Sequence, residues 1–178
     1  EAAGGTLTTE LRAAPYLSGL RISRDRRYAA GTNGSEVLLV DLVTGATRAR
    51  FALAGVRSVD LSPTGDEIAC IAPSATGAPE LSRWELAGDT FSRKTGVTAD
   101  AAMVARYAGT ALVIGAGGGL RVITAAGEMV TLARDELADV TAIAADGAFL
   151  AAASPEWIWI FGLSAAATVA HPGEGGAG

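Results

Sequence analysis

The sequence predicts an all-β chain made of four similar units, each containing four antiparallel strands. Three observations predict this fold class. A strand–turn–strand pattern occurs four times, a third strand follows each copy, and the distance from the turn to the end of that third strand is nearly constant. The composition suits a packed core, because 49% of the 178 residues are hydrophobic and only 19% are charged. A chain of this length and hydrophobicity is expected to fold around a sizeable core rather than to be disordered.

The strand–turn–strand pattern consists of an apolar run, a polar turn and a second apolar run. Its four copies are residues 19–31, 56–72, 101–115 and 140–153. Their turns are centred on Arg26, Gly65, Gly109 and Gly147. The second and fourth copies are the most alike, since Leu61 corresponds to Ile143 and Ile68 to Leu150 when the two glycines are aligned. The pattern predicts the first two strands of each unit.

A third strand follows each copy, at residues 36–45, 80–88, 120–127 and 157–164. The distance from the turn to the end of this strand is 15 residues in three copies and 20 in the second. The extra residues lie in the loop 73–79, which is rich in Gly, Pro and Ser. A further short β-like run comes after each third strand, so each unit has four strands in roughly 40 residues, the dimensions of a β-propeller blade.

The units resemble degenerate WD repeats over about residues 18–170. The closest match is 56–86, with the turn SPTGDEIA and with Trp84-Glu85 where the family has a Trp-Asp pair. Residues 41–45 match the same end of a blade, with valine in place of tryptophan. The family's Gly-His pair and structural histidine are absent from all four copies. The resemblance therefore implies a β-propeller that binds protein but lacks the usual hydrogen-bonded tetrad within each blade.

The predicted blades are residues 18–55, 56–97, 98–138 and 139–170. Residues 1–17 could add the outer strand of a preceding or closing blade, and 171–178 are expected to form a flexible tail. The segment 132–140 contains good helix formers and could instead form a short helical turn between the third and fourth blades.

Four blades of this kind are expected to form an open arc. A blade buries both of its faces only by stacking on neighbours, so two bare end faces would expose apolar side chains. We expect the ring to be completed in one of three ways: by another copy of the chain, by the blades of a partner, or by further residues of the same polypeptide. A compact four-bladed ring is the alternative, because propellers typically have four to eight blades.

The expected function is that of a non-catalytic protein-interaction scaffold or sensor. The partner-binding residues are predicted on the rim that carries the insertion, because insertions in repeats commonly mark the binding face. They are Arg57, Pro73, Ser74, Thr76, Pro79, Glu156 and Trp157. Trp157 could instead pack between blades. Two other functions are left open: the propeller portion of a hydrolase or lyase whose site is completed by missing chain, and a purely structural half of an obligate assembly.

No catalytic, metal or cofactor site is predicted. His171 is the only histidine and lies in the expected tail, and Cys70 is expected to be a buried structural thiol. Residues 113–120 resemble a dinucleotide-binding glycine motif, but position 120 is leucine and a strand follows, which favours a turn between strands. The carboxylates, Asp60 and Glu67 among them, are expected mainly at solvated turns.

The charge pattern argues against nucleic acid as a partner, since the net charge is −5 and there is no long basic run. Arg24, Arg26 and Arg27 with Tyr28 cluster at one turn, which could bind an acidic partner or could simply be a soluble turn. The apolar stretch 147–170 contains a Ser-Pro-Glu sequence at its centre, so two strands are favoured over a membrane helix. The lack of a disulfide framework fits the cytoplasm.

Overall fold

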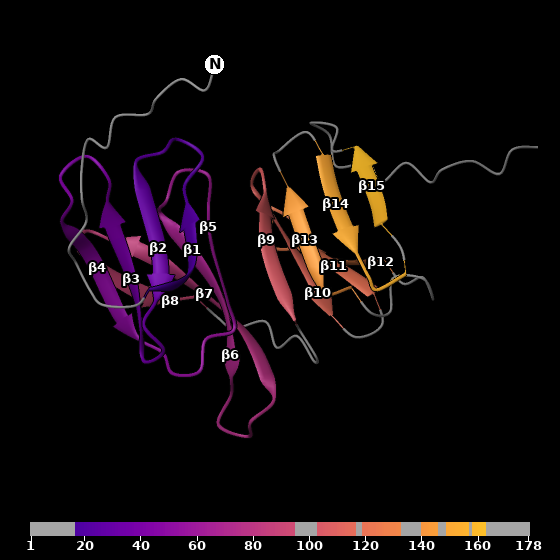
Figure 1. Cartoon of the computed structure of the whole chain (residues 1–178), viewed down its shortest axis with the longest axis horizontal. Coiled ribbons are helices and arrows are strands. Elements are labelled where there is room, and N and C mark those ends of the chain that lie inside the picture. Colours follow the sequence, from indigo (N-terminus) through magenta and orange to yellow (C-terminus); the bar gives the residue numbers. More distant parts are fainter. Residues whose placement is uncertain are drawn as a thin grey trace, which may run out of the picture.

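The computed structural model of the chain describes residues 17–94, 103–116, 119–132, 140–145, 149–156 and 158–162. These residues form fifteen strands in four antiparallel sheets, which we call blades 1 to 4 (Figure 1). Blade 1 contains β1 (Ser18–Ile22), β2 (Tyr28–Thr32), β3 (Glu36–Asp41) and β4 (Thr47–Ala52). Blade 2 contains β5 (Ser58–Leu61), β6 (Glu67–Pro73), β7 (Pro79–Ala87) and β8 (Thr90–Arg93). Blade 3 contains β9 (Val104–Ala108), β10 (Ala111–Ala116), β11 (Gly119–Ile123) and β12 (Met129–Leu132). Blade 4 contains β13 (Ala142–Ala145), β14 (Phe149–Ala153) and β15 (Ile158–Gly162).

Each sheet is a meander in which consecutive strands are hydrogen-bonded neighbours. The predicted all-β propeller with four blades is therefore confirmed. The fourth strand predicted for blade 4 lies outside the described residues, as do the segments 1–16 and 171–178 and most of the segment for which a helical turn was considered.

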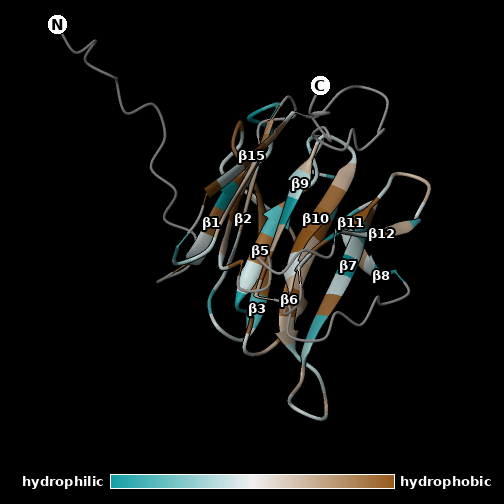
Figure 2. Cartoon of the chain, turned by 90° about the vertical axis from the view of Figure 1, so that its right-hand side faces the viewer, coloured by the Kyte–Doolittle hydropathy of each residue, from teal (hydrophilic) through white to brown (hydrophobic). Residues whose placement is uncertain are grey.

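The blades pack in chain order through their inner strands, because β1 lies against β5, β5 against β9 and β9 against β13. Three apolar clusters fill the spaces between successive blades. The middle strands contribute most to them, and Figure 2 shows how apolar β10 is along its length. In β6 every residue from Glu67 to Ala72 is buried. Burial on both faces explains why these strands appear in the sequence as continuous apolar runs.

The turn between the first and second strands has the same form in blades 1 and 2, where Arg26 and Gly65 occupy equivalent positions with positive φ, at 60° and 74°. The corresponding turn of blade 3 is shorter and contains Gly109, whose φ is also positive at 61°. In blades 1 and 2 the turn is closed by a serine, Ser23 or Ser62, whose Oγ accepts a hydrogen bond from the first amide of the next strand. Arg26 is the one residue other than glycine that has positive φ in the described part of the chain.

Aromatic side chains fill the outer part of the space between blades 1 and 2. The rings of Phe51 and Trp84 are stacked with centroids 4.1 Å apart, and Phe91 meets Phe51 edge-on. Trp84 belongs to blade 2 and Phe51 to blade 1, so the contact ties the two sheets together. Trp159 and Phe161 of blade 4 likewise pack against the apolar cluster between blades 3 and 4.

Candidate functional site

Five of the predicted partner-binding residues lie together around the β6–β7 hairpin, namely Arg57, Pro73, Ser74, Thr76 and Pro79. The Arg57 amide donates a hydrogen bond to the carbonyl of Ile71 over 2.8 Å, which fixes Arg57 at the base of the hairpin. Glu156 is exposed at the β14–β15 turn, on the same rim but on blade 4. Trp157 lies outside the described residues.

The β6–β7 hairpin is an ordered arm that extends beyond the ends of the other blades (Figure 1). Its strands stay paired as far as Pro73 and Pro79, and two backbone hydrogen bonds close the turn, from Ser74 to Ala78 and from Gly77 to Ser74. The Ser74 and Thr76 hydroxyls are 2.9 Å apart. An arm of this kind presents exposed polar groups in a fixed arrangement, which suits recognition better than a loose loop does.

A cleft of about 590 Å³, which we call the axial cleft, is lined by residues from the inner strands of all four blades. It opens near the β1–β2, β5–β6 and β9–β10 turns, where it is bordered by Arg24, Pro63 and Gly109. Since β6 joins the β5–β6 turn to the β6–β7 turn, the cleft and the hairpin arm lie at opposite ends of the blades. This cleft could not be predicted from the sequence, because its walls come from segments about 40 residues apart.

Asp60 is the buried carboxylate of the cleft and belongs to β5. The Tyr107 amide donates a 2.6 Å hydrogen bond to its Oδ2, and Arg21 Nε lies 3.7 Å from its Oδ1. Burial raises the pKa of Asp60, although the Tyr107 amide and the Arg106 and Arg21 guanidiniums oppose the shift. The expectation of a solvated turn position was wrong for this residue, because the packing of blade 3 against blade 2 covers it.

Glu67 was also expected near a solvated turn, and it too is buried. Arg83 Nε and Lys94 Nζ contact its carboxylate at 2.5 and 2.9 Å, and the Tyr107 hydroxyl donates a further hydrogen bond to it. Burial opposes ionisation of Glu67, but these three donors outweigh it and lower its pKa. Tyr107 is on blade 3, so this network joins two blades in a chain that lacks the tetrad of the WD family.

Blade 4 has one buried face and one exposed apolar face. Leu150, Ala152, Trp159 and Phe161 pack against blade 3. The strand register places Ala151 opposite Ile160 and Ala153 opposite Ile158 on the other face, where the isoleucines are 73% and 74% exposed. Such exposure is unusual for side chains in a sheet and marks a surface that can pack against another protein.

Cys70 is fully buried in β6, and burial raises its pKa to about 12. The prediction of a buried structural thiol is confirmed. The glycine run at 113–120 joins two paired strands, β10 and β11, with Ala116 opposite Gly119, so it does not precede a helix. Within the described ranges, no group of three His, Cys, Asp or Glu residues is placed to hold a metal ion.

The stretch 147–170 contains the paired strands β14 and β15, as predicted. Among the described residues, no helix is long and apolar enough to cross a membrane.

Comparison with solved structures supports the propeller. The chain is similar to the Cps50 (Swd1) β-propeller domain of Myceliophteria thermophila, with 18% identity, a TM-score of 0.66, and coverage of 90% of this chain and 56% of that one. It is also similar to the dihydro-heme d1 dehydrogenase NirN, with 18% identity, a TM-score of 0.61, and coverage of 83% and 34%. For TolB from Acinetobacter baumannii the identity is 22%, the TM-score 0.57, and the coverage 77% and 37%.

The chain thus spans between a third and just over half of the length of these structures. No protein-family model matches the sequence, and no curated protein does. At these identities the likeness concerns the fold. Together with the sheet topology, it confirms the predicted β-propeller fold.

Proposed function

We propose that the chain is a non-catalytic protein-interaction scaffold, and that the exposed face of blade 4 binds another propeller blade. The observation that carries this proposal is the exposure of Ile158 and Ile160, which are 74% and 73% exposed on one face of β15. Full burial of an aliphatic side chain of this size contributes about 1.5–3 kcal/mol. A surface of this composition favours association with a protein over continued contact with water.

The same face of the earlier blades binds the next blade in the chain. When Gly65 is aligned with Gly147, Ile71 corresponds to Ala153. Leu81 is paired with Ile71, as Ile158 is paired with Ala153. In blade 2, Ile71 and Leu81 are fully buried against the apolar residues of blade 3. By this correspondence, the natural occupant of the blade 4 face is another blade with an apolar sheet face.

A second copy of the chain offers such a blade. Leu20 and Ile22 of β1 are about half exposed, and by the alignment of Arg26 with Gly65 they correspond to Val59 and Leu61, which pack against blade 1. Blade 1 of one copy can therefore pack on blade 4 of another, and two such contacts close a ring of two chains. Other residues on this side of blade 1, Ala29, Leu38 and Val40, are already buried, so the proposed contact centres on β1.

The rim that carries the hairpin arm is proposed as the surface for a different protein partner. Its contact residues would be Arg57, Pro73, Thr76 and Glu156, which are exposed, together with the partly exposed Ser74 and Pro79. The fixed geometry of the β6–β7 turn supports the choice of these residues as partner contacts. Protein rather than nucleic acid or membrane is the proposed partner, in keeping with the net charge of −5, and the proposed compartment is the cytoplasm.

The test of the assembly is the solution mass, measured by light scattering at several concentrations. We expect a species at twice 17.9 kDa that Ile158→Glu converts to monomer, because a buried carboxylate without a partner is costly. The matched control is Val43→Glu, which places the same charge at an exposed turn position of blade 1 and should leave the mass unchanged. A wild-type monomer at all concentrations would refute the assembly.

A further inference from the structure

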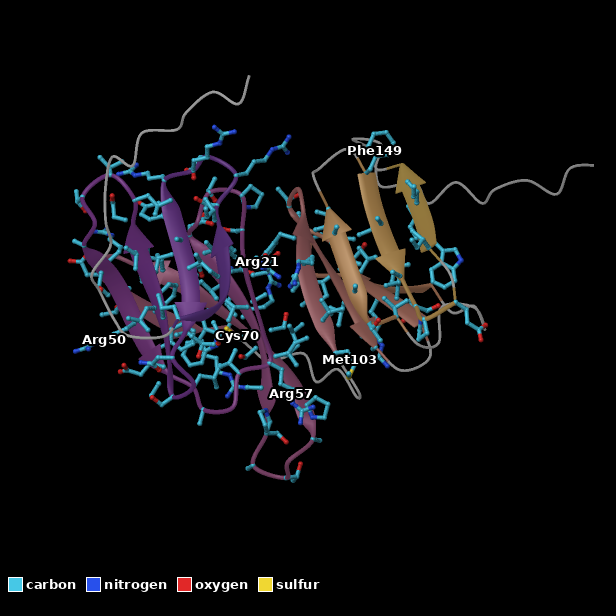
Figure 3. The ribbon with its side chains drawn as sticks, in the orientation of Figure 1. Arg21, Arg50, Arg57, Cys70, Met103 and Phe149 are labelled. Carbon is cyan, nitrogen blue, oxygen red and sulfur yellow. The ribbon has the colours of Figure 1, made fainter. Side chains whose placement is uncertain are left out.

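The axial cleft carries an excess of positive charge. Three arginines line it, Arg21, Arg24 and Arg106, whereas Asp60 is the single carboxylate among the described lining residues. The chain as a whole has a net charge of −5, so this local excess runs against the average. In Figure 3 the Arg21 side chain points from β1 toward the blades that carry β9 and β13.

The one carboxylate of the cleft is already engaged. Asp60 accepts the Tyr107 amide and lies near Arg21, as described above. Arg106 donates through one terminal nitrogen only, to the Ser58 hydroxyl at 3.2 Å and the Ala105 carbonyl at 2.6 Å. No carboxylate of the described residues is within 4 Å of Arg106 or Arg24. Guanidinium donors therefore remain available on the wall of the cleft.

The Arg106 guanidinium is in an unfavourable position for a cation. Burial, and then repulsion by Arg21, lowers the pKa of Arg106, and the attraction of Asp60 only partly offsets this. A second anion placed between the arginines would relieve the repulsion and supply the missing acceptor. Guanidinium groups bind carboxylates through two parallel hydrogen bonds, which makes a carboxylate a well-matched ligand.

We infer that the axial cleft binds a carboxylate-bearing segment of a polypeptide, with Arg24 and Arg106 as the main contacts to the carboxylate. Leu61, Pro63 and Ile143 supply an apolar wall for a neighbouring side chain. The volume of about 590 Å³ is in the range of pockets that hold ligands of a few residues. The inference adds a site at the end opposite the hairpin arm, and it rests on the proposed function only in taking the ligand to be part of a protein.

The test is isothermal titration calorimetry on the full chain with three probes. They are an acetylated and amidated Leu-Glu-Leu-Glu-Leu peptide, the same peptide with Gln in place of Glu, and free glutarate. We expect the Glu peptide to bind at least about tenfold more tightly than either of the others, because only it offers both the charge and the apolar flank. Its affinity should fall as salt is raised.

Substitutions identify the site. Arg24→Gln and Arg106→Gln should each weaken binding of the Glu peptide about tenfold, whereas Arg50→Gln, an exposed position on β4 far from the cleft (Figure 3), should not. Asp60→Asn should strengthen binding, since it removes the competing carboxylate. Thermal melting checks that each variant is folded, and the exposed Arg24 keeps the test valid if Arg106→Gln is unstable.

Three results would overturn the inference: no binding of the Glu peptide at millimolar concentration, unchanged affinity in both Arg24→Gln and Arg106→Gln, or glutarate binding as tightly as the peptide. The last result would assign the cleft to a small acid. None of these outcomes changes the light-scattering mass, so failure of this inference and failure of the proposed assembly can be told apart.

Discussion

Blades 2 and 4 place aliphatic residues at the same position of the sheet with opposite results. Leu81 in blade 2 is fully buried, and Ile158, its counterpart in blade 4, is 74% exposed. The local structure is alike, because Leu81 is paired across the sheet with Ile71 and Ile158 with Ala153, which is the counterpart of Ile71. The difference is that blade 2 has a neighbour on both sides. A blade therefore acquires most of its stability from its neighbours, and an end blade has apolar area left for association.

The largest expected difference in the free energy of unfolding is between truncation of Leu81 and truncation of Ile158. Leu81→Ala should lower the free energy of unfolding by about 2–5 kcal/mol, because it opens a cavity in a packed core. Ile158→Ala should change it by less than about 0.5 kcal/mol in the monomer, since the side chain is already in water. Urea denaturation at low protein concentration measures both. Equal losses would mean that the blade 4 face is covered within one chain.

The second comparison concerns two glutamates that contact the same lysine. Glu67→Gln should destabilise the chain by about 3 kcal/mol, because it removes the buried negative charge beside Arg83 and Lys94 and replaces an oxygen that accepts from both of them with an NH2 donor. Glu85→Gln removes only an exposed ion pair with Lys94 and should cost less than about 1 kcal/mol. Chemical denaturation of the two variants tests whether the buried network holds blades 2 and 3 together. If Glu67→Gln costs no more than Glu85→Gln, the network contributes little.

The Glu67 contribution should depend on pH in a defined direction. Its pKa is lowered in the folded chain relative to the ordinary value of 4.5. The unfolded state therefore binds the proton more readily, and the stabilisation is fully present above pH of about 4.5. It is lost as the pH falls through the lower folded-state pKa. The stability difference between wild type and Glu67→Gln should shrink below pH 4.5, and a difference that grows on acidification would contradict the assigned contacts.

The smallest effect concerns the turns of blades 1 and 2. Arg26→Gly should stabilise the chain by about 0.5–1 kcal/mol, because Arg26 has the positive φ that costs a residue with a Cβ atom. Gly65→Ala, the reverse change at the equivalent position, should be destabilising, since its Cβ would come within 2.5 Å of the Tyr28 ring. Thermal unfolding measures both shifts, and a destabilised Arg26→Gly would show that the arginine side chain has a role of its own.

Much of the fold follows from the sequence, because the strand–turn–strand pattern keeps its register and the turn positions need a residue that tolerates positive φ. The roles of Asp60 and Glu67 do not follow. Each sits next to a turn in the sequence, and its burial depends on Tyr107, which is 47 residues from Asp60 and 40 from Glu67, in the next blade. The axial cleft is hidden for the same reason, since it is assembled from four separate strands.

The β15 strand shows a further limit of sequence reasoning. It is apolar at every position from Ile158 to Phe161, and such a run is typical of a strand that is buried on both faces. In the structure one face of β15 is only partly buried and the other is exposed. An apolar sequence shows which faces of a strand can be buried, but a face is buried only if a neighbouring blade packs against it.

The most direct test of the proposed assembly is thiol reactivity on the two end faces. Ile160→Cys and Leu20→Cys each place a thiol on one of these faces, while the buried Cys70, with its raised pKa, serves as an unreactive internal reference. If blade 1 of one copy packs on blade 4 of another, alkylation of both introduced thiols should slow as the protein concentration rises. Alkylation rates that are independent of concentration at both positions would contradict the assembly and leave blade 4 with an open face.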